Sequence, residues 1–345
     1  MKIIHSERHM LHATSENVPG CAFAFREVPE RAERILAALE SAVPGEFRPP
    51  DDYDRAALTT VHPEGYLDYL RDAYSLRQTF LADGHPVVAE AFAVRSARRR
   101  PNTYPGIVGN YHFDNAAPIL AGTWEAVLAS ANCALTAADA VRSGDRVAYA
   151  LCRPPGHHAA ADLAGGYCYL NNAALASRHL QRGTDTRVAI LDVDFHHGNG
   201  TQEIFYSDPT VLYLSLHADT TVEYPFFWGG EEETGAGAGE GFNRNFPLPD
   251  DTDDTLYLET LDRAIDVLRD FHPEYLVVSA GFDLMEGDPE VLGLGFRITG
   301  VGLGEIARRL ARLSLPTVLV QEGGYRLTHL GEYAATFLHS FNDAL

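Results

Sequence analysis

The sequence predicts an α/β fold, a single domain over residues 1–345 with a mostly parallel, multi-stranded central sheet flanked by helices on both faces. Short, nearly continuous apolar runs recur along the chain, and segments with helical periodicity separate them. Such runs are typical of strands in a parallel sheet, because helices cover both faces of that sheet. With 345 residues, 46% of them hydrophobic, the chain is long and apolar enough for a large core.

The expected strands and helices alternate in chain order. The apolar runs interpreted as strands cover residues 2–6, 146–152, 187–193, 210–217, 274–282 and 317–324. The segments with a helical pattern cover residues 30–42, 122–144, 171–183, 254–271 and 302–313. Asn171 or Asn172 caps one of these helices, and Gly144 and Gly183 stand where helix C-caps belong. Scattered prolines and glycines in residues 85–122 break the periodicity, while the aromatic content argues against disorder.

Composition argues against several functional classes. The chain has 27 Lys and Arg against 48 Asp and Glu, a formal net charge of −21 that disfavours broad nucleic-acid binding. No apolar run approaches the roughly 18 residues that a membrane span needs. Four cysteines form no C-x-x-C pair, which argues against a disulfide framework and a zinc ribbon. We therefore expect a cytoplasmic protein that binds neither nucleic acid nor membranes.

Polar residues follow the apolar runs at their C-terminal ends. His157 and His158 follow the run at 146–152, the stretch LDVDFHHGNG closes the run at 187–193, and EGGY closes the last run. In an open parallel sheet the carboxyl ends of the strands share one edge, where ligands bind. We therefore expect these clusters to meet at one site.

A metal site is expected among these residues. Asp194 and His196 lie two residues apart, so on an extended segment their side chains leave the same face. Asp283 follows the run at 274–282 and supplies a third hard ligand. Two carboxylates and one imidazole leave a position open, as in catalytic rather than structural zinc sites. A lone Asp-x-Asp motif more often caps a helix or forms a turn than binds a metal. The predicted metal site therefore depends on finding several such polar residues at the ends of different strands.

Six motifs in order resemble a known family: RPPGHH, GGYCYLNNAA, ILDVDFHHGNGTQEIFY, YLSLH, SAGFD and EGGY. Together they resemble the histone deacetylase superfamily, which has the arginase-deacetylase fold. The longer strings are similar to its acetylpolyamine amidohydrolase branch. The resemblance covers nearly the whole chain and includes VPERAERI, VHPEGYLDYL and GTWEAVLAS.

The resemblance implies a zinc-dependent amidohydrolase. It implies that Asp194, His196 and Asp283 bind the zinc ion. Fe²⁺ or Co²⁺ can take the place of zinc at such a site. The catalytic residues that it implies are His158 as general base and then general acid, His157 as its electrostatic companion, and Tyr325 as the hydroxyl that polarises the amide carbonyl.

Further positions follow from the same resemblance. Asp192 would orient His157. Asn199 stands where some relatives carry an aspartate facing the second histidine. An amide favours the imidazolium less than a carboxylate does, which should leave His158 a readier base. Two structural sites for K⁺ or Na⁺ are implied, one formed by Asp192, Ser215 and Leu216 and the other by Phe205, Asp208 and Val211.

The implied substrate is a small, cationic acetylated amine, such as an acetylpolyamine or acetyldiamine, which yields acetate and free amine. Gly166 and Tyr167 would wall a narrow tunnel, and Tyr224 occupies a place where relatives have an aromatic residue. The irregular insertion at about 85–122 is implied to narrow this tunnel and to mediate a homodimer. The acidic residues that some relatives carry there against the distal ammonium are not evident, and Asp114 is the expected substitute.

Two alternative functions stay open, and a third is disfavoured. A deacylase of acyl-lysine in proteins or peptides stays open, because SAGFDLMEGDP resembles the general deacetylase pattern more than that of the branch. A non-catalytic metal-binding or ligand-binding protein also stays open. An arginase-like ureohydrolase is disfavoured, since its two-metal centre needs more bridging carboxylates than the sequence offers.

Overall fold

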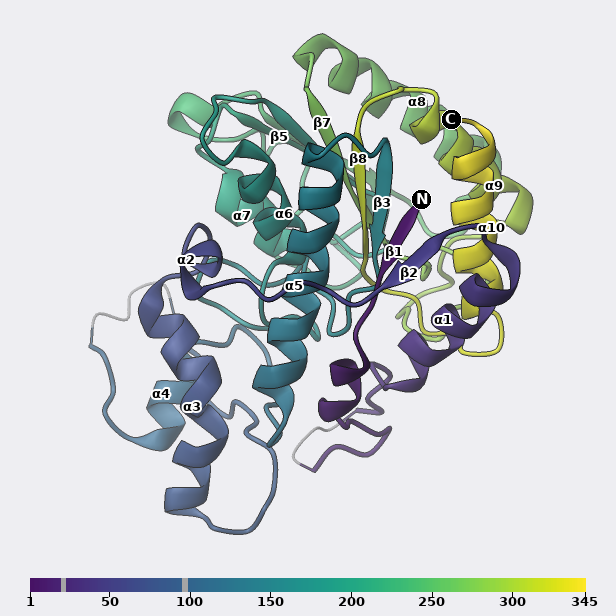
Figure 1. Cartoon of the computed structure of the whole chain (residues 1–345). Helices are drawn as coiled ribbons and strands as arrows, with labels where there is room; N and C mark the ends of the chain where they lie inside the picture. Colours follow the sequence, from purple (N-terminus) through teal and green to yellow (C-terminus); the bar gives the residue numbers. More distant parts are fainter. Residues whose placement is uncertain (20–22, 95–98) are drawn as a thin grey trace.

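Eight strands form one central sheet in the computed structural model, which describes residues 1–19, 23–94 and 99–345 (Figure 1). The order across the sheet is β2-β1-β3-β8-β7-β4-β5-β6, and every pairing is parallel. The predicted α/β class is confirmed. The strands are β1 (Lys2–Ile4), β2 (Glu46–Arg48), β3 (Val147–Ala150), β4 (Val188–Asp192), β5 (Val211–Ala218), β6 (Asn243–Leu248), β7 (Tyr275–Ala280) and β8 (Thr317–Gln321).

Helices cover both faces of this sheet, as the sequence predicts. On one face lie α5 and α6, and on the other lie α1, α8, α9 and α10 (Figure 1). Beside α5, the helices α3 and α4 share a third apolar cluster with it. The helices are α1 (Glu30–Ala42), α2 (Arg55–Leu58), α3 (Glu64–Phe80), α4 (Tyr104–Asn110), α5 (Thr123–Arg142), α6 (Asn172–Gln181), α7 (Asn199–Phe205), α8 (Asp254–Phe271), α9 (Gly300–Ala311) and α10 (Leu330–Asp343). None of the helices described is long and apolar enough to cross a bilayer.

Strand β4 shows why the apolar runs are continuous. Its side chains alternate between the two faces, as in any strand. Ala189 and Leu191 pack into the cluster under α1, α8, α9 and α10. Val188 and Ile190 pack into the cluster under α5 and α6. Because both faces are covered, every position of the strand is apolar until Asp192 ends it.

The two strands that the sequence did not predict lie at the edges of the sheet. Strands β2 and β6 are the outermost in the strand order. An edge strand is covered less completely and tolerates polar residues and proline. In β6, Arg244 is exposed, and Pro247 has no main-chain N–H to donate to a neighbouring strand. The sequence of β6 therefore contains no continuous apolar run that would predict a strand.

Several helix boundaries agree with the sequence prediction. Helices α1 and α8 span the predicted residues. The side chain of Asn171 caps α6 by accepting a hydrogen bond from the amide of Ala174 at 2.9 Å. Gly144 and Gly183 adopt positive φ angles after α5 and α6, as helix C-caps do. In the expected insertion, the regular parts described are α4 and two isolated bridges, from Val87 to Ile119 and from His112 to Ala164. Residues 95–98, like Cys21, lie outside the described residues.

A buried charged cluster ties the N-terminal segment to the carboxyl edge of the sheet. The carboxylate of Glu27 accepts hydrogen bonds from Arg31 and from Arg153, each at 3.1 Å. Arg31 also donates to the main-chain carbonyls of Glu322 and Gly324, both at 2.7 Å, in the loop after β8. All three charged side chains are buried, so the single carboxylate partly neutralises two guanidinium groups away from water.

We predict that Glu27→Ala lowers the free energy of unfolding by about 3–5 kcal/mol, because it leaves two guanidinium groups buried without their carboxylate. Urea unfolding followed by circular dichroism measures this difference. The control is Glu30→Ala, three residues further on, whose exposed carboxylate pairs with Arg34 on the surface of α1. Equal unfolding midpoints for the two variants would contradict the prediction.

Candidate active site

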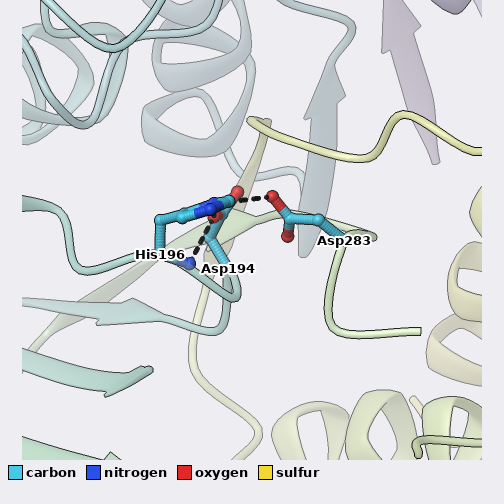
Figure 2. Close-up of side chains that lie close together, drawn as sticks. All are labelled: Asp194, His196 and Asp283. Atoms are coloured by element: carbon cyan, nitrogen blue, oxygen red, sulfur yellow. Dashed lines mark hydrogen bonds and ion pairs between the residues drawn. The ribbon is translucent and has the colours of Figure 1, made fainter. Parts of the chain in front are cut away.

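Three expected metal ligands meet at the carboxyl edge of the sheet. Asp194 and His196 lie in the loop after β4, and Asp283 lies in the loop after β7. Figure 2 shows the three side chains converging on one point. Their candidate ligand atoms all lie within 4.8 Å of one another, and all three residues are buried.

The local conformation around the first two ligands differs from the extended one that the spacing suggested. Strand β4 ends at Asp192, and the chain bends over residues 194–196. The main-chain amide of His196 donates to the carboxylate of Asp194 at 2.9 Å, which closes this bend. The imidazole Nδ1 of His196 therefore lies 3.6 Å from Asp194 Oδ1 and 3.2 Å from Asp283 Oδ2.

Main-chain amides from neighbouring loops hold the two carboxylates. The amide of Gly323 donates to Asp194 at 2.7 Å, and the amide of Phe195 donates to Asp283 at 3.0 Å. Glycine is required at two of the flanking positions, since a Cβ on Gly281 would collide with Asp194 and one on Gly323 would collide with Asp283. The glycines of SAGFD and EGGY thus let three loops approach one point.

The donor set fits a divalent cation. Burial and the neighbouring charge of Asp194 raise the pKa of Asp283 above its usual range. Burial acts in the same direction on Asp194, but His157 and His196 hold its pKa below the usual range. A cation between the two carboxylates would relieve their repulsion. Two oxygen donors and one nitrogen donor, with a position left open, are the set expected of catalytic zinc.

His157 is held by the carboxylate at the end of β4, as expected. Its Nδ1 donates to Asp192 Oδ2 at 3.1 Å. Burial by itself lowers the pKa of His157, but the Asp194 and Asp192 carboxylates outweigh burial and raise it to about 10. These two carboxylates therefore favour the protonated form of His157.

His158 faces an amide instead of a carboxylate. Its Nδ1 donates to Asn199 Oδ1 at 2.8 Å, which is the contact that the sequence suggested. Burial first, and then the charges of His157 and His196, hold the pKa of His158 well below its usual range. The ring is therefore neutral, and its Nε2 is the nitrogen that can take up a proton.

Tyr325 stands at the same site, supported by residues that the sequence analysis did not single out. Its ring lies under the guanidinium of Arg31, 4.5 Å from the ring centroid. The carboxylate of Asp288 accepts the amides of Tyr325 and Arg326 at 2.7 and 3.1 Å. Glu322 accepts the amides of Gly156 and His157 at 2.7 and 3.1 Å and so fixes the histidine loop.

A signal for two of these residues is visible in the sequence. Asp288 lies within SAGFDLMEGDP, and Glu322 opens EGGY, so both stand in motifs that follow strands. Neither role follows from the spacing, because each carboxylate binds main-chain amides of another loop. Arg31 lies within VPERAERI, a string that the resemblance includes, but nothing in that string indicates that its side chain reaches the loop after β8.

The site opens into a cavity of about 460 Å³ whose walls include His158, His196 and Tyr325. The four expected substrate-binding residues, Asp114, Gly166, Tyr167 and Tyr224, also line it. The carboxylate of Asp114 accepts hydrogen bonds from the Tyr224 hydroxyl at 2.6 Å and from the amides of Gly166 and Ala116 at 3.0 and 2.8 Å. Asp114 thus braces the wall of the cavity.

The residues of the expected monovalent-cation sites lie in two places. Asp192 and Ser215 are partners in the register of β4 and β5, with Leu216 next in the strand. The Ser215 hydroxyl is hydrogen-bonded to His217 Nδ1 at 2.8 Å. Phe205, Asp208 and Val211 flank the turn between α7 and β5, where the Asp208 amide donates to the Phe205 carbonyl at 2.9 Å. Cation binding at both places remains a prediction.

The chain is similar in sequence and in structure to several known proteins. A family model described as the histone deacetylase domain matches residues 25–341. Acetylpolyamine amidohydrolase 1 of Pseudomonas aeruginosa is 43% identical over 100% of this chain and 99% of its own. The crystal structure of acetylpolyamine aminohydrolase from Burkholderia pseudomallei has a TM-score of 0.93 at 39% identity, covering 100% of this chain and 99% of that one. The HDA15 HD domain has a TM-score of 0.81 at 27% identity, covering 99% and 89%.

We predict that Asp283→Ala lowers the affinity for Zn²⁺ by more than about a hundredfold, since loss of a residue that merely orients a ligand already costs about 10- to 100-fold. Competition with a chromogenic chelator measures the affinity. The control is Glu286→Ala in the same loop, whose side chain is exposed. Wild-type affinity in the Asp283 variant would rule out this site.

Proposed function

The chain belongs to the histone deacetylase family, and from this premise we propose that it is a zinc-dependent amidohydrolase of small acetylated amines, such as acetylpolyamines or acetyldiamines. The products are acetate and the free amine. One observation carries the proposal: the three metal-ligand side chains converge on one point, and one of them, His196, lines the same cavity as His158 and Tyr325. The full-length similarity to proteins named acetylpolyamine amidohydrolases supports the substrate class.

In the proposed mechanism, the metal site activates the water and the carbonyl group, and the two histidines serve the proton transfers. Zinc, when bound by Asp194, His196 and Asp283, supplies a Lewis acid that lowers the pKa of water and polarises a carbonyl oxygen. We propose that His158 Nε2 accepts the proton of the attacking water and then donates it to the leaving amine. The neutral ring that faces Asn199 suits the first step. The positive charge of His157 favours return of the proton in the second.

Tyr325 completes the proposed mechanism. Its hydroxyl would donate a hydrogen bond to the substrate carbonyl oxygen and stabilise the negative charge that develops there. Burial raises the pKa of Tyr325 well above its usual value, so the hydroxyl keeps its proton at neutral pH. The contacts from Arg31 and Asp288 hold this side chain at the wall of the cavity.

We also propose that the whole chain is one catalytic domain that forms a homodimer in the cytoplasm through the insertion at about 85–122. Phe92 and Val94 in that insertion are 44% and 69% exposed, and a partner subunit would cover them. The structural K⁺ or Na⁺ sites described above belong to this proposal, as does the use of Fe²⁺ or Co²⁺ in place of Zn²⁺.

A deacylase of acyl-lysine in proteins or peptides is the second candidate. Exposed apolar side chains near the cavity favour it, because a peptide needs surface to bind beyond the acylated side chain. Phe226 and Leu292 line the cavity and are 46% and 68% exposed.

Substrate preference separates these two candidates. We expect kcat/KM of the zinc-loaded protein to be higher for acetylputrescine, acetylcadaverine and acetylspermidine than for an acetyl-lysine peptide, because carboxylates line the cavity and attract a second cationic group. Release of acetate measures all four reactions. Preference for the peptide would support the second candidate, and turnover of none of the four would contradict the proposed function.

We predict that Tyr325→Phe lowers kcat by about 100- to 1000-fold, because it removes one donor to the developing oxyanion. Zinc content should stay at the wild-type level, since the tyrosine is not a ligand. The control is Tyr333→Phe, whose hydroxyl contacts Arg326 and not the cavity. Near-normal turnover in the Tyr325 variant would refute the proposed role.

A further inference from the structure

Two loops that lie far apart in the sequence form the outer end of the cavity. His196 and Tyr325, at its inner end, are 6% and 8% exposed. Phe226, in the loop after β5, and Leu292, in the loop after β7, line the same cavity and are 46% and 68% exposed. We call the part of the cavity that these two exposed residues line its mouth. The width of the mouth depends on what holds the two loops together.

Glu223 connects the two loops. Its side chain lines the cavity and is buried, with 2% of the residue exposed. Its Oε1 accepts a hydrogen bond from the amide of Tyr224 at 2.9 Å, and its Oε2 accepts one from the amide of Leu292 at 2.7 Å. Since each oxygen of one carboxylate holds the main chain of a different loop, Glu223 links the two walls of the mouth directly.

The loop after β5 is also fixed at a second point, through Tyr224. The hydroxyl of Tyr224 donates to the carboxylate of Asp114 in the insertion at 2.6 Å. Its ring lies edge-on to those of His158 and His196, with centroids 5.0 and 6.0 Å away. The residue that Glu223 holds by its amide therefore contacts the proposed general base with its ring.

The loop after β7 has further contacts on either side of Leu292. Before it, the amide of Glu290 donates to Asp288 at 3.0 Å. After it, the amide of Leu294 donates to Asp250 at 3.3 Å. Loss of the hydrogen bond to Glu223 would therefore release the middle of this segment while its two ends stay held.

Resting on the proposed function, we propose that Glu223 is a positioning residue that fixes the width of the mouth and so limits the bulk of the amines that the cavity admits. It would act through the main chain of Tyr224 and Leu292 and not on the reacting atoms. A small acetylated amine would pass between the two loops. A peptide that carries acyl-lysine would need them to separate, because its chain continues on both sides of the acylated residue.

The chemistry of the two amide contacts suggests which substitutions separate the loops. Hydrogen bonds to a charged acceptor are stronger than those between neutral groups, and both oxygens of a carboxylate can accept. Glutamine has one acceptor oxygen, and its NH₂ group would face a main-chain N–H. Glu223→Gln therefore breaks one of the two links with little change in side-chain size, whereas Glu223→Ala breaks both.

The test compares two substrates of equal charge and different bulk. Acetylputrescine and an acetyl-lysine tripeptide amide with a free amino terminus and uncharged flanking residues each carry one ammonium group. The measured quantity is the ratio of kcat/KM for acetylputrescine to kcat/KM for the tripeptide, in zinc-loaded wild type, Glu223→Gln and Glu223→Ala. The matched control is Glu231→Gln, which removes an exposed charge from the same loop.

We expect Glu223→Gln to lower this ratio about 3- to 10-fold, the usual effect of losing one hydrogen bond, because the tripeptide gains access that the small amine already has. Glu223→Ala should lower it by at least about tenfold, and Glu231→Gln should keep the wild-type ratio. If Glu223→Ala does not fold, Glu223→Gln decides alone. Hydrogen exchange of residues 289–295 should also become faster in Glu223→Gln, because the Leu292 amide loses its acceptor.

A role in folding alone would give a different result. If both substrates lost kcat/KM by the same factor in the Glu223 variants, the ratio would stay constant and the proposal would be overturned. Hydrolysis of neither substrate by the wild type would instead overturn the proposed function, and this inference with it.

Discussion

The burial of two carboxylates at the carboxyl edge of the sheet is the constraint on which the rest of the site depends. Asp194 and Asp283 are both about 1% exposed, and burying such charges is unfavourable by several kcal/mol unless other groups compensate. Two loops, those after β4 and β8, supply that compensation through the amides of Phe195, His196 and Gly323. The open face between the carboxylates then suits a dication. The glycines of the motifs follow from the same constraint, because only a residue without Cβ lets these loops approach so closely.

A second layer of buried charge holds the catalytic side chains in place. Asp192, Glu322 and Asp288 each accept hydrogen bonds from a catalytic residue or its main chain. Burial raises the pKa of Glu322 and of Asp288 to about 7, while the amide donors act in the opposite direction and stabilise the carboxylate forms. The Glu27 cluster joins this layer through Arg31, which binds the main chain of the loop that carries Tyr325. The contacts that stabilise the fold around Glu27 therefore also hold the loop that carries Tyr325 in position.

Features that depend on a local pattern of residues could be predicted from the sequence. Features that depend on contacts between distant parts of the chain could not. Buried strands such as β4 are continuous apolar runs, so both their existence and the polar residues at their ends were legible. Strand β6 was missed because an edge strand tolerates Arg244 and Pro247. The sequence predicted that Asp194, His196, Asp283 and both histidines would lie at one edge of the sheet, because each of them lies in a loop that follows a strand. Asp288 and Glu322 were missed as functional residues because each acts on amides of a different loop, and no spacing in the sequence records that contact.

The loop after β7 joins chemistry to recognition. Within eight residues it carries Asp283 at the metal centre, Asp288 beneath Tyr325 and Glu290 at the outer part of the cavity. Asp288 accepts the amides of Tyr325 and Arg326 with one oxygen and the amide of Glu290 with the other, at 3.0 Å. One carboxylate therefore sets the position of the main chain at both Tyr325 and Glu290, two residues that line the cavity. A change that displaced Asp288 would shift both parts of the cavity wall together.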